Sequence, residues 1–463
     1  ANYNSAFGHV TMYSNSTGAN NAAFGGITMY SNTTGSSNSA FGYNALYSNT
    51  TANEGTAVGY QAAYSNTSGN GTVAVGVRAL LNNVTATANT AVGREALKNA
   101  TAGSNTAVGY DAGQLVTSGT NNNFFGHASG AATTTGSSNV AIGMTALRYN
   151  TTGSSNTAIG HQALLNNTTQ SYNTAVGNLS ADANTTGVVT AFGHDSAGSN
   201  TTGLYNTALG QSSLASVTTT SGNTAVGYTA LYSTTGSNNT AVGYRAGYNN
   251  ITGVSNTFLG KDAGFSSTAN GNTFLGMDSG YNVTSGANNT ILGRYNGNQD
   301  GLDIRTSNNR IVLSDGDGNP ELFWNTTAWN FTGPSGAGAI TTDGTQFIPG
   351  SNKVEYRWYC GTTGSRTAVS FRNPNGQVGY INVSGTSTSY STSSDYRLKE
   401  NVVAMTGATD RLKQLNPSRF NFIADADTTV DGFLAHEVQT VVPEAITGAH
   451  NEVDADGNPV YQG

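Results

Sequence analysis

A short pattern that ends in glycine recurs along the first part of the chain, and it limits the possible folds more than any other feature. In its most regular form the pattern reads Asn-Thr-Ala-Val-Gly, as at Asn89–Gly93. The glycine occurs eighteen times, always 16 or 17 residues apart, at Gly8, Gly25, Gly42, Gly59, Gly76, Gly93, Gly109, Gly126, Gly143, Gly160, Gly177, Gly193, Gly210, Gly227, Gly243, Gly260, Gly276 and Gly293. A period this short and regular is typical of a solenoid, in which each repeat forms one coil and stacks on its neighbours.

The residues before each glycine predict a short strand. The residue next to the glycine is apolar, alanine usually precedes it, and threonine and asparagine commonly precede the alanine. Because side chains alternate across a strand, threonine and the apolar residue share one face, and asparagine and alanine share the other. Apolar residues on both faces predict two buried surfaces, a core inside each coil and a contact with other chains. The glycine then turns the chain, since it has no Cβ to resist a positive φ.

The residues after each glycine complete the coil. Alanine or serine stands three residues past the glycine, which suggests a second short strand, and the remainder has the composition of turns. The residue directly after the glycine varies freely, so we expect it to point outward. If each coil adds one strand spacing of about 4.8 Å, the coils form a rod on the order of 85 Å long. The sequence therefore predicts a β-solenoid shaft over residues 1–293.

Composition excludes several classes of protein. The 463 residues include 60 glycines and only 9% charged residues, which is not typical of a globular enzyme. The net charge is −7 and no basic run occurs, so we expect no nucleic-acid partner. No apolar run is long enough to span a bilayer, so we expect no membrane insertion. The single Cys360 excludes an intrachain disulfide, and a partly buried thiol is its expected state.

The period is lost after Gly293, and the charge density rises there. Only 13 charged residues precede Arg294, and 30 occur from that residue onward. We assign residues 294–345 to a β-hairpin connector, with strands on either side of the turn Asp315–Asn319. This turn has acidic residues that suit calcium, but it lacks the rest of a twelve-residue calcium loop, so a plain turn is favoured.

We assign residues 346–390 to a β-rich knob. Its expected strands are Glu355–Cys360, Thr367–Phe371 and Val378–Val383, and a Ser/Thr-rich linker is expected at Ser384–Ser394. Helical spacing then appears at Arg397–Val403 and Asp410–Leu415, whereas Asp431–Gln439 mixes strand and helix signals.

Four sequence blocks near the end of the chain carry a resemblance to a known family. They are Ser394–Asn401, Leu415–Pro417, Gly432–Gln439 and Val442–Glu444. In this order they resemble the auto-processing intramolecular chaperone domain at the C-termini of phage tail fibres and tailspikes, the type known from endosialidases. The resemblance covers about residues 391–463. His436 stands where the family commonly has glutamine, and the sequence ends before the C-terminal helices expected of the family, so this domain is expected to be incomplete.

The resemblance implies one chemical step, a cut of the chain's own backbone between Ser393 and Ser394. Ser394 would supply the hydroxyl and Lys399 the base. A lysine acts as a base only when its pKa is lowered, which burial achieves, so we expect Lys399 to be desolvated only in an assembled trimer. A solvated turn is the alternative interpretation of this pair. Weaker candidates for supporting roles are Asp395, Arg397, His436 and Glu437, and for the first two a surface ion pair is an equally good interpretation.

A shaft made of near-identical coils would need a domain of this kind for its assembly. Eighteen similar coils can pair out of register by one coil with little loss, and a terminal clamp that aligns three chains removes that degeneracy. The repeat also resembles the head repeats of trimeric autotransporter adhesins, which carry a similar Asn-x-Ala-Val/Ile-Gly column and form trimeric β-rolls. A β-roll and an interwound triple β-helix therefore both stay open.

We accordingly expect a mainly β homotrimer with a fibrous β-solenoid shaft, a β-rich connector and a small α+β chaperone domain. The expected function is that of a phage tail fibre for host-surface attachment, carried on the virion and facing outward. Its partners would be other virion tail proteins and a host receptor, with a glycan as one candidate. The alternative is a bacterial cell-surface trimeric adhesin with the same terminal domain. Apart from the single self-cleavage we expect no enzymatic substrate, no cofactor and no metal.

Some outward positions are candidates for contacts with a receptor, although the sequence identifies no receptor-binding residues. Aromatic residues directly after the glycine could stack on sugars, at Tyr43, Tyr60, Tyr110, Tyr228 and Tyr244. Histidines at the same position are expected to be solvated, at His9, His127, His161 and His194. The chain begins within a repeat, so we expect it to be a fragment of a longer protein.

Overall fold

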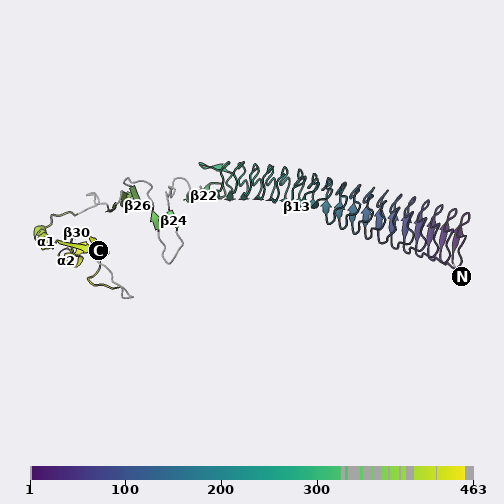
Figure 1. The fold of residues 1–463 in the computed structure, drawn as a ribbon, viewed down its shortest axis with the longest axis horizontal. Helices are drawn as coiled ribbons and strands as arrows, with labels where there is room; N and C mark the ends of the chain where they lie inside the picture. The colour runs from purple at the N-terminus through teal and green to yellow at the C-terminus, as the bar shows by residue number, and fades with distance from the viewer. Residues whose placement is uncertain are drawn as a thin grey trace. The chain divides into compact units, whose positions relative to one another are not determined.

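The computed structural model describes residues 3–324, 401–423 and 425–453, together with the strand segments 329–331, 345–347, 356–358, 366–373, 376–384 and 387–392. The chain divides into two compact units, Ala1–Tyr359 and Cys360–Gly463. The first unit contains the predicted β-solenoid, whose coils stack from the purple N-terminal end to the green strand β22 (Figure 1). The prediction of a mainly β fold with a solenoid body is therefore confirmed.

Eighteen short strands, one for each repeat, form a parallel ladder along the solenoid. They are β1 (Ser5–Phe7), β2 (Ala22–Phe24), β3 (Ser39–Phe41), β4 (Thr56–Val58), β5 (Val73–Val75), β6 (Thr90–Val92), β7 (Thr106–Val108), β8 (Asn123–Phe125), β9 (Val140–Ile142), β10 (Thr157–Ile159), β11 (Thr174–Val176), β12 (Val188–Phe192), β13 (Leu204–Leu209), β14 (Thr224–Val226), β15 (Thr240–Val242), β16 (Thr257–Leu259), β17 (Thr273–Leu275) and β18 (Thr290–Leu292). Equivalent residues pair in register, as Ala158 does with Ala175. Because successive repeats of one chain pair with each other, the shaft is a single-chain solenoid and not an interwound triple helix.

The repeated glycine is required by both conformation and space. In the first seventeen copies its φ lies between +128° and +141°, a region that residues with a Cβ rarely adopt. The backbones of neighbouring coils also approach closely here, since a Cβ on Gly42 would lie 2.5 Å from the carbonyl oxygen of Gly59. Any other residue would therefore push two coils apart.

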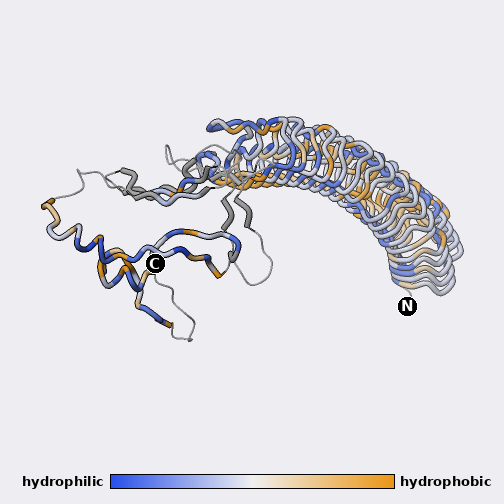
Figure 2. Tube along the Cα trace, turned by 60° about the vertical axis from the view of Figure 1, so that its left-hand side comes forward, coloured by the Kyte–Doolittle hydropathy of each residue, from blue (hydrophilic) through white to orange (hydrophobic). Residues whose placement is uncertain are grey.

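The core follows the predicted alternation of side chains. Alanines of the strands, such as Ala40, are buried together with the preceding asparagines, such as Asn38, and the turn adds Ala45 and Leu46. The outer face carries the threonine and the apolar residue before the glycine, and both are exposed or half-buried. Hydrophobic residues consequently recur at the same places in successive coils, as the orange positions in Figure 2 show.

Buried asparagines satisfy their amides by bonding to the neighbouring coils. The Nδ2 of Asn38 donates to the carbonyl oxygen of Ala52 (2.8 Å), and its Oδ1 accepts the backbone N–H of Gly55 (2.8 Å). A second row of asparagines, three residues after the leucine position, forms an amide ladder in which Asn49 donates to Asn32 (2.7 Å). These bonds link the coils through the core, where an unpaired amide would be costly.

The segment after the glycine is a turn, and the prediction of a second strand there is wrong. Asn44 and Leu46 have positive φ values of 60° and 48°, which bend the backbone out of extended geometry. The turn nevertheless stacks on the next coil, since the N–H of Leu46 donates to the carbonyl oxygen of Ala62 (3.0 Å). The apolar pattern predicted correctly which residues of this segment are buried, but it did not predict their backbone conformation.

The parallel ladder continues for one rung past the last regular glycine. Strand β18 pairs in parallel with β21 (Ile311–Ser314), after a coil enlarged by the small hairpin β19 (Asn298–Gln299) and β20 (Leu302–Asp303). Tyr295 fills the core of this coil, and its hydroxyl donates to the carbonyl oxygen of Leu302 (2.6 Å). The larger coil therefore provides a buried aromatic residue near the end of the ladder.

A hairpin follows the ladder. Strand β21 pairs antiparallel with β22 (Pro320–Trp324), which pairs in turn with β23 (Trp329–Phe331). In the connecting turn the carboxylate of Asp315 accepts the backbone N–H groups of Asp317 (3.0 Å) and Asn319 (2.8 Å). This carboxylate is thus used by the turn itself, in line with the plain-turn interpretation.

Further antiparallel strands follow. β24 (Thr345–Phe347) pairs with β25 (Tyr356–Trp358), and β26 (Arg366–Asn373), β27 (Gly376–Ser384) and β28 (Ser387–Thr392) form a three-stranded sheet. The predicted linker Ser384–Ser394 is wrong over most of its length, because β28 lies there. Threonine suits a strand as well as a linker, so its composition was ambiguous. Cys360 lies outside the described residues.

The terminal segment contains both helices and strands. Its elements are α1 (Ala408–Gln414), β29 (Ser418–Phe422), β30 (Asp425–Gly432), α2 (Ala435–Val441) and the 3-10 helix η2 (Pro443–Ala445). The helix predicted at Asp410–Leu415 is confirmed. The helix predicted at Arg397–Val403 is absent over 401–403, which is the part that the structure describes. Within the described ranges no helix has the length and apolar character needed to span a bilayer.

Candidate functional site

The predicted processing site belongs to a segment that the structure does not describe. Ser393, Ser394, Asp395, Arg397 and Lys399 all lie outside the described residues. The cleavage bond and the pairing of a serine nucleophile with a lysine base therefore stay predictions.

The two remaining candidates, His436 and Glu437, lie in the first turn of α2. Oε2 of Glu437 accepts a hydrogen bond from Nδ2 of Asn416 (3.3 Å), which precedes β29. The imidazole of His436 stacks on that of His450, with ring centroids 4.3 Å apart and planes 11° from parallel. Both side chains thus connect α2 to segments distant in sequence, which is a positioning role within the domain.

Two arginines join the other elements of this domain. Arg411 of α1 donates to the carbonyl oxygen of Val441 (3.1 Å) and pairs with Glu444 of η2 (2.8 Å). Its hydrogen bond holds the pKa of Glu444 below the usual value. Arg419 of β29 makes two hydrogen bonds to the carboxylate of Asp431 on β30, the shorter at 2.6 Å. The pattern of helix, hairpin and helix is therefore held mainly by polar contacts at the surface.

Apolar side chains of this domain are poorly covered by the chain itself. Neither α1 nor α2 contains a buried residue. Large apolar side chains are exposed at Val402, Val403, Met405, Leu412 and Phe433. A small domain normally needs a buried core to be stable, so this degree of apolar exposure is unusual for a domain of this size.

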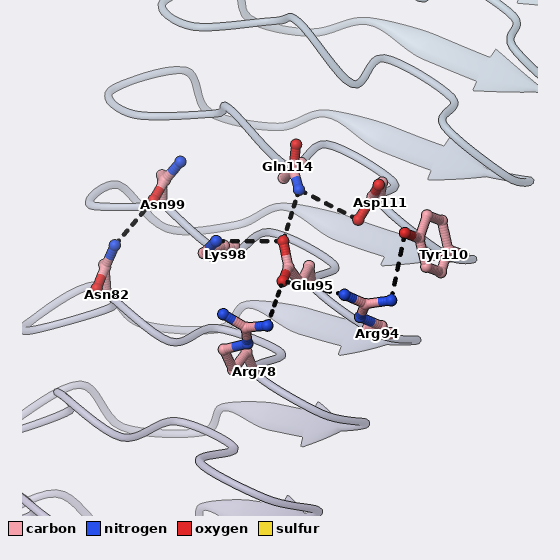
Figure 3. A network of polar contacts seen from close by, with 9 residues as sticks. All are labelled: Arg78, Asn82, Arg94, Glu95, Lys98, Asn99, Tyr110, Asp111 and Gln114. Carbon is pink, nitrogen blue, oxygen red and sulfur yellow. Dashed lines mark hydrogen bonds and ion pairs between the residues drawn. The ribbon is translucent and has the colours of Figure 1, made fainter.

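A buried carboxylate forms the centre of a polar cluster that contains several charged side chains of the shaft (Figure 3). The side chain of Glu95 is only 9% exposed, and it pairs with Arg78 of the preceding coil (3.1 Å) and with Lys98 of its own coil (3.2 Å). Gln114 of the following coil donates to the same carboxylate (2.7 Å). The cluster therefore ties three successive coils together.

The charges around Glu95 set its protonation. Burial alone raises the pKa of Glu95, but hydrogen bonds from Lys98 and Gln114 and the charges of Lys98 and Arg78 outweigh it and lower the pKa. For Asp111 the balance is opposite, since burial and the negative charge of Glu95 raise its pKa. Glu95 is thus held as a carboxylate with both oxygens engaged, which suits a structural role better than acid–base catalysis.

No metal site is visible in the described part of the chain, where no three His, Cys, Asp or Glu residues gather closely enough to hold an ion.

The outer face of the solenoid carries a continuous apolar row made of the residues before the glycines. Phe24 and Phe41 stack there with ring centroids 5.0 Å apart. Farther along, Ile142 is 42% exposed and Leu292 is 47% exposed. A row of apolar side chains on every coil is more than a soluble surface normally exposes.

Aromatic side chains of the turns that follow the repeated glycines stack into ladders, and we call this side of the coils the turn face. The predicted outward tyrosines are half-exposed, but they stack on each other, with centroid distances of 6.1 Å for Tyr43 and Tyr60 and 5.4 Å for Tyr228 and Tyr244. Most of their ring faces are therefore covered by neighbours, and stacking on sugars in the expected manner is restricted. Of the histidines, His127 stacks on Tyr110 (5.3 Å) instead of standing free in solvent.

Sequence reasoning missed an aromatic row that lies five residues after the glycine. It comprises Tyr13, Tyr30, Tyr47 and Tyr64 in the first coils and Tyr232, Tyr248, Phe265 and Tyr281 in the last ones. Tyrosine at a constant interval of 17 residues was the available signal in the first coils. This interval alone does not show whether the tyrosines are buried or exposed, because the positive-φ turn before them places this position at the surface.

Comparison with known proteins adds one finding. Residues 394–447 match the protein family described as "Chaperone of endosialidase". Searches of curated proteins and of solved structures returned no match. The predicted endosialidase-type chaperone domain is therefore confirmed for this segment. The fold and the match together define a fibre-like β-solenoid protein with a C-terminal intramolecular chaperone domain.

Proposed function

We propose that the protein is a homotrimeric phage tail fibre that attaches the virion to a host surface. In this proposal the β-solenoid is the shaft, and the terminal domain aligns three chains before the shafts pack together. The domain then releases itself by a cut between Ser393 and Ser394. The function of the shaft would be structural, with a single intramolecular turnover.

The observation that carries the proposal is the combination of a uniform solenoid with a chaperone-like domain at its end. Nearly identical coils offer many registers of similar energy, so a shaft of this kind needs a device that sets the alignment of its chains. A domain similar to the endosialidase chaperones, placed after the last coil, supplies such a device.

The surfaces of the chain also favour assembly. The apolar row on the outer face of the solenoid runs past Ile142 to Leu292, and the terminal domain exposes Val402, Leu412 and Phe433. Contacts between chains, made separately by the shafts and by the terminal domains, would cover these two surfaces.

Assembly and cleavage are tested on the purified full chain. Sedimentation of the native protein should give three times the mass of residues 1–393, because the cut domain has been released, and a denaturing gel of the unfractionated preparation should show two fragments separated before Ser394. The Ser394→Ala variant should assemble equally well and stay uncut, whereas Ser393→Ala should still be cut. A monomeric native mass, or cleavage of Ser394→Ala at the same bond, contradicts the proposal.

The location on a virion distinguishes the proposal from its alternative, a bacterial trimeric adhesin. Gold-labelled antibodies against the shaft should decorate the tails of phage particles released from the producing cells. Labelling confined to the surface of the producing cells would favour the adhesin. The same shaft and terminal domain could also form part of such an adhesin.

A further inference from the structure

The first coils of the shaft carry a regular strip of tyrosines. Tyr13, Tyr30, Tyr47 and Tyr64 stack face to face, with ring centroids 5.0–5.4 Å apart and planes within 6° of parallel. Tyr13 is 68% exposed, and the other three are half-buried. Each of them is followed by a serine, so side-chain hydroxyls recur at every coil.

A second aromatic row, Tyr43 and Tyr60, flanks the first on the same face of the coil. The evidence for this placement comes from equivalent positions in later coils. There the guanidinium of Arg245 lies over Tyr244 of the second row (5.0 Å) and over Phe265 of the first row (4.9 Å). One side chain thus spans both rows. Gln61 occupies the position of Arg245 in its own coil, so the chain has a neutral amide there in place of a guanidinium.

The tyrosines of the strip and the serines that follow Tyr13, Tyr30, Tyr47 and Tyr64 carry no charge, and Glu54 is the single charged residue between Tyr13 and Tyr64 in the sequence. No Asp, Glu, Lys or Arg precedes Glu54, and the next charged residue is Arg78. Surface charge steers charged ligands toward or away from a site, and the one charge in these coils, the exposed carboxylate of Glu54, would attract no anion. The strip is therefore suited to a neutral ligand and offers no ion pair to phosphate, sialic acid or uronic acid groups.

The geometry of the rows limits the kind of neutral ligand. Because the rings cover each other's faces, a ligand meets ring edges and phenolic hydroxyls. Within the described ranges of this chain, no group accepts a hydrogen bond from the hydroxyl of Tyr30 or Tyr47. Hydroxyls repeated at one coil spacing fit a polymer whose own polar groups recur at a similar interval, and an extended chain of pyranose sugars has this property.

We propose that the strip formed by Tyr13, Tyr30, Tyr47, Tyr64, Tyr43 and Tyr60 binds an extended, uncharged polysaccharide lying along the shaft, with one sugar for each coil. The inference rests on the proposed attachment function and names the chemical class of the receptor. Three strips on one trimeric shaft would make weak contacts multivalent.

The ligand class is tested with the assembled full-length protein on a panel of defined oligosaccharides. The neutral members are cellohexaose, chitohexaose, laminarihexaose and a linear mannohexaose, and each is compared with its disaccharide. The anionic members are oligomers of sialic acid and of galacturonic acid. We expect binding to a neutral hexamer and at least tenfold weaker binding to its disaccharide, since a longer chain contacts more coils. Selection of the anionic oligomers, or no binding to any neutral hexamer, overturns the inference.

The residues are tested with a double variant, Tyr30→Phe with Tyr47→Phe, which removes two hydroxyls and keeps the stacked rings. Its affinity for the neutral hexamer should fall about tenfold, the effect of losing two neutral hydrogen bonds. The control is Tyr149→Phe, an exposed tyrosine outside both rows, which should bind like the wild type. Unchanged affinity of the double variant overturns the inference. So does loss of assembly by this variant, because the strip would then belong to the contact between chains.

The attachment function and the polysaccharide strip can be rejected independently of each other. The antibody-labelling experiment tests attachment to a virion without any glycan. If the tails are labelled but the neutral hexamers do not bind, the attachment function stands and the polysaccharide strip is rejected.

Discussion

The ring of Phe124 occupies the space that Gly113 leaves open in the preceding coil: a Cβ on Gly113 would lie 2.7 Å from Cδ2 of Phe124. A Cβ on Gly130, in the same coil as Phe124, would overlap the same ring. Ordinary coils have alanine in the strand and leucine at this turn position, as in Ala141 and Leu147. The exchange of alanine for phenylalanine is thus matched by an exchange of leucine for glycine, which keeps the core filled.

This pairing predicts a rescue between two substitutions. Phe124→Ala alone should lower the free energy of unfolding by about 3–5 kcal/mol, because it leaves a cavity. Adding Gly130→Leu should restore much of the loss by rebuilding an ordinary coil. Leucine fits the backbone, since Leu147 has a φ of 53° and Gly130 has 56°. Denaturant unfolding followed by circular dichroism measures both variants, and a double variant no more stable than Phe124→Ala contradicts this account.

The buried asparagine row predicts a pH-dependent defect in Asn122→Asp. Nδ2 of Asn122 donates to the carbonyl oxygen of Gly136 (2.9 Å) and to Oδ1 of Asn105 (3.1 Å). A carboxylate cannot donate, so a buried charge would face two acceptors, and the variant should lose about 2–4 kcal/mol near neutral pH. Protonation restores one donor, so the defect should shrink as the pH falls.

The measurement for this variant is the Tm as a function of pH. Asn121→Asp is the matched control, because Asn121 is exposed and its charge would stay in water. A defect of Asn122→Asp that is the same at acidic and neutral pH would show that the hydrogen-bond donor is not what matters at this position.

Glu95→Gln should weaken the shaft in a defined pH window. The pKa of Glu95 in the folded chain is lowered from its usual value of 4.5, so its pairs with Arg78 and Lys98 stabilise the fold fully above that value. This contribution is lost as the pH falls through the lowered pKa. The variant should therefore be less stable by roughly 1–2 kcal/mol near neutral pH and equal to the wild type in acid.

Thermal unfolding across this pH range checks the expectation, with Glu54→Gln, which removes an exposed carboxylate, as the control. A stability difference that persists in strong acid would mean that Glu95 acts through packing and not through its charge.

Much of the shaft could be predicted from the sequence because each repeat solves the same packing problem. The alternation around Ala40 separates core from surface without any knowledge of the turn. The φ of Leu46 could not be predicted in this way, because leucine rarely adopts positive values and nothing in its apolar character signals one. The pairing of Phe124 with Gly130 is visible in the repeat columns, but its meaning requires knowing that the two positions face each other in the core.

The terminal domain was predicted differently, from resemblance. The blocks around Ser394 and Glu437 indicated the family that residues 394–447 match. The desolvation expected for Lys399, which lies outside the described residues, could not be derived from one chain, because it would depend on neighbouring chains. The tyrosine row was missed for a local reason, since the side on which Tyr47 emerges is decided by the positive φ of the residue before it.

Lys399→Arg should abolish self-cleavage and leave assembly intact. Arginine keeps the positive charge, but it stays protonated at any accessible pH and cannot act as a base. A denaturing gel should show only the uncut chain, while sedimentation gives a trimer with three times the full-chain mass. Lys413→Arg, an exposed substitution on α1, should be cut normally. Normal cutting of Lys399→Arg would remove Lys399 from the role of base.

The apolar row of the solenoid predicts which face is buried between chains. Ile142 lies in this row and is 42% exposed in one chain, whereas Met144, two residues later on the turn face, is 50% exposed. In a single chain, aspartate at either position would remain in water and cost little. In a trimer that packs through the row, Ile142→Asp would bring unpaired carboxylates into the interface, where each costs several kcal/mol. Ile142→Asp should therefore sediment as a monomer or aggregate, and Met144→Asp should remain trimeric. If both variants assemble equally well, the chains meet through another face, and the apolar row has a different partner.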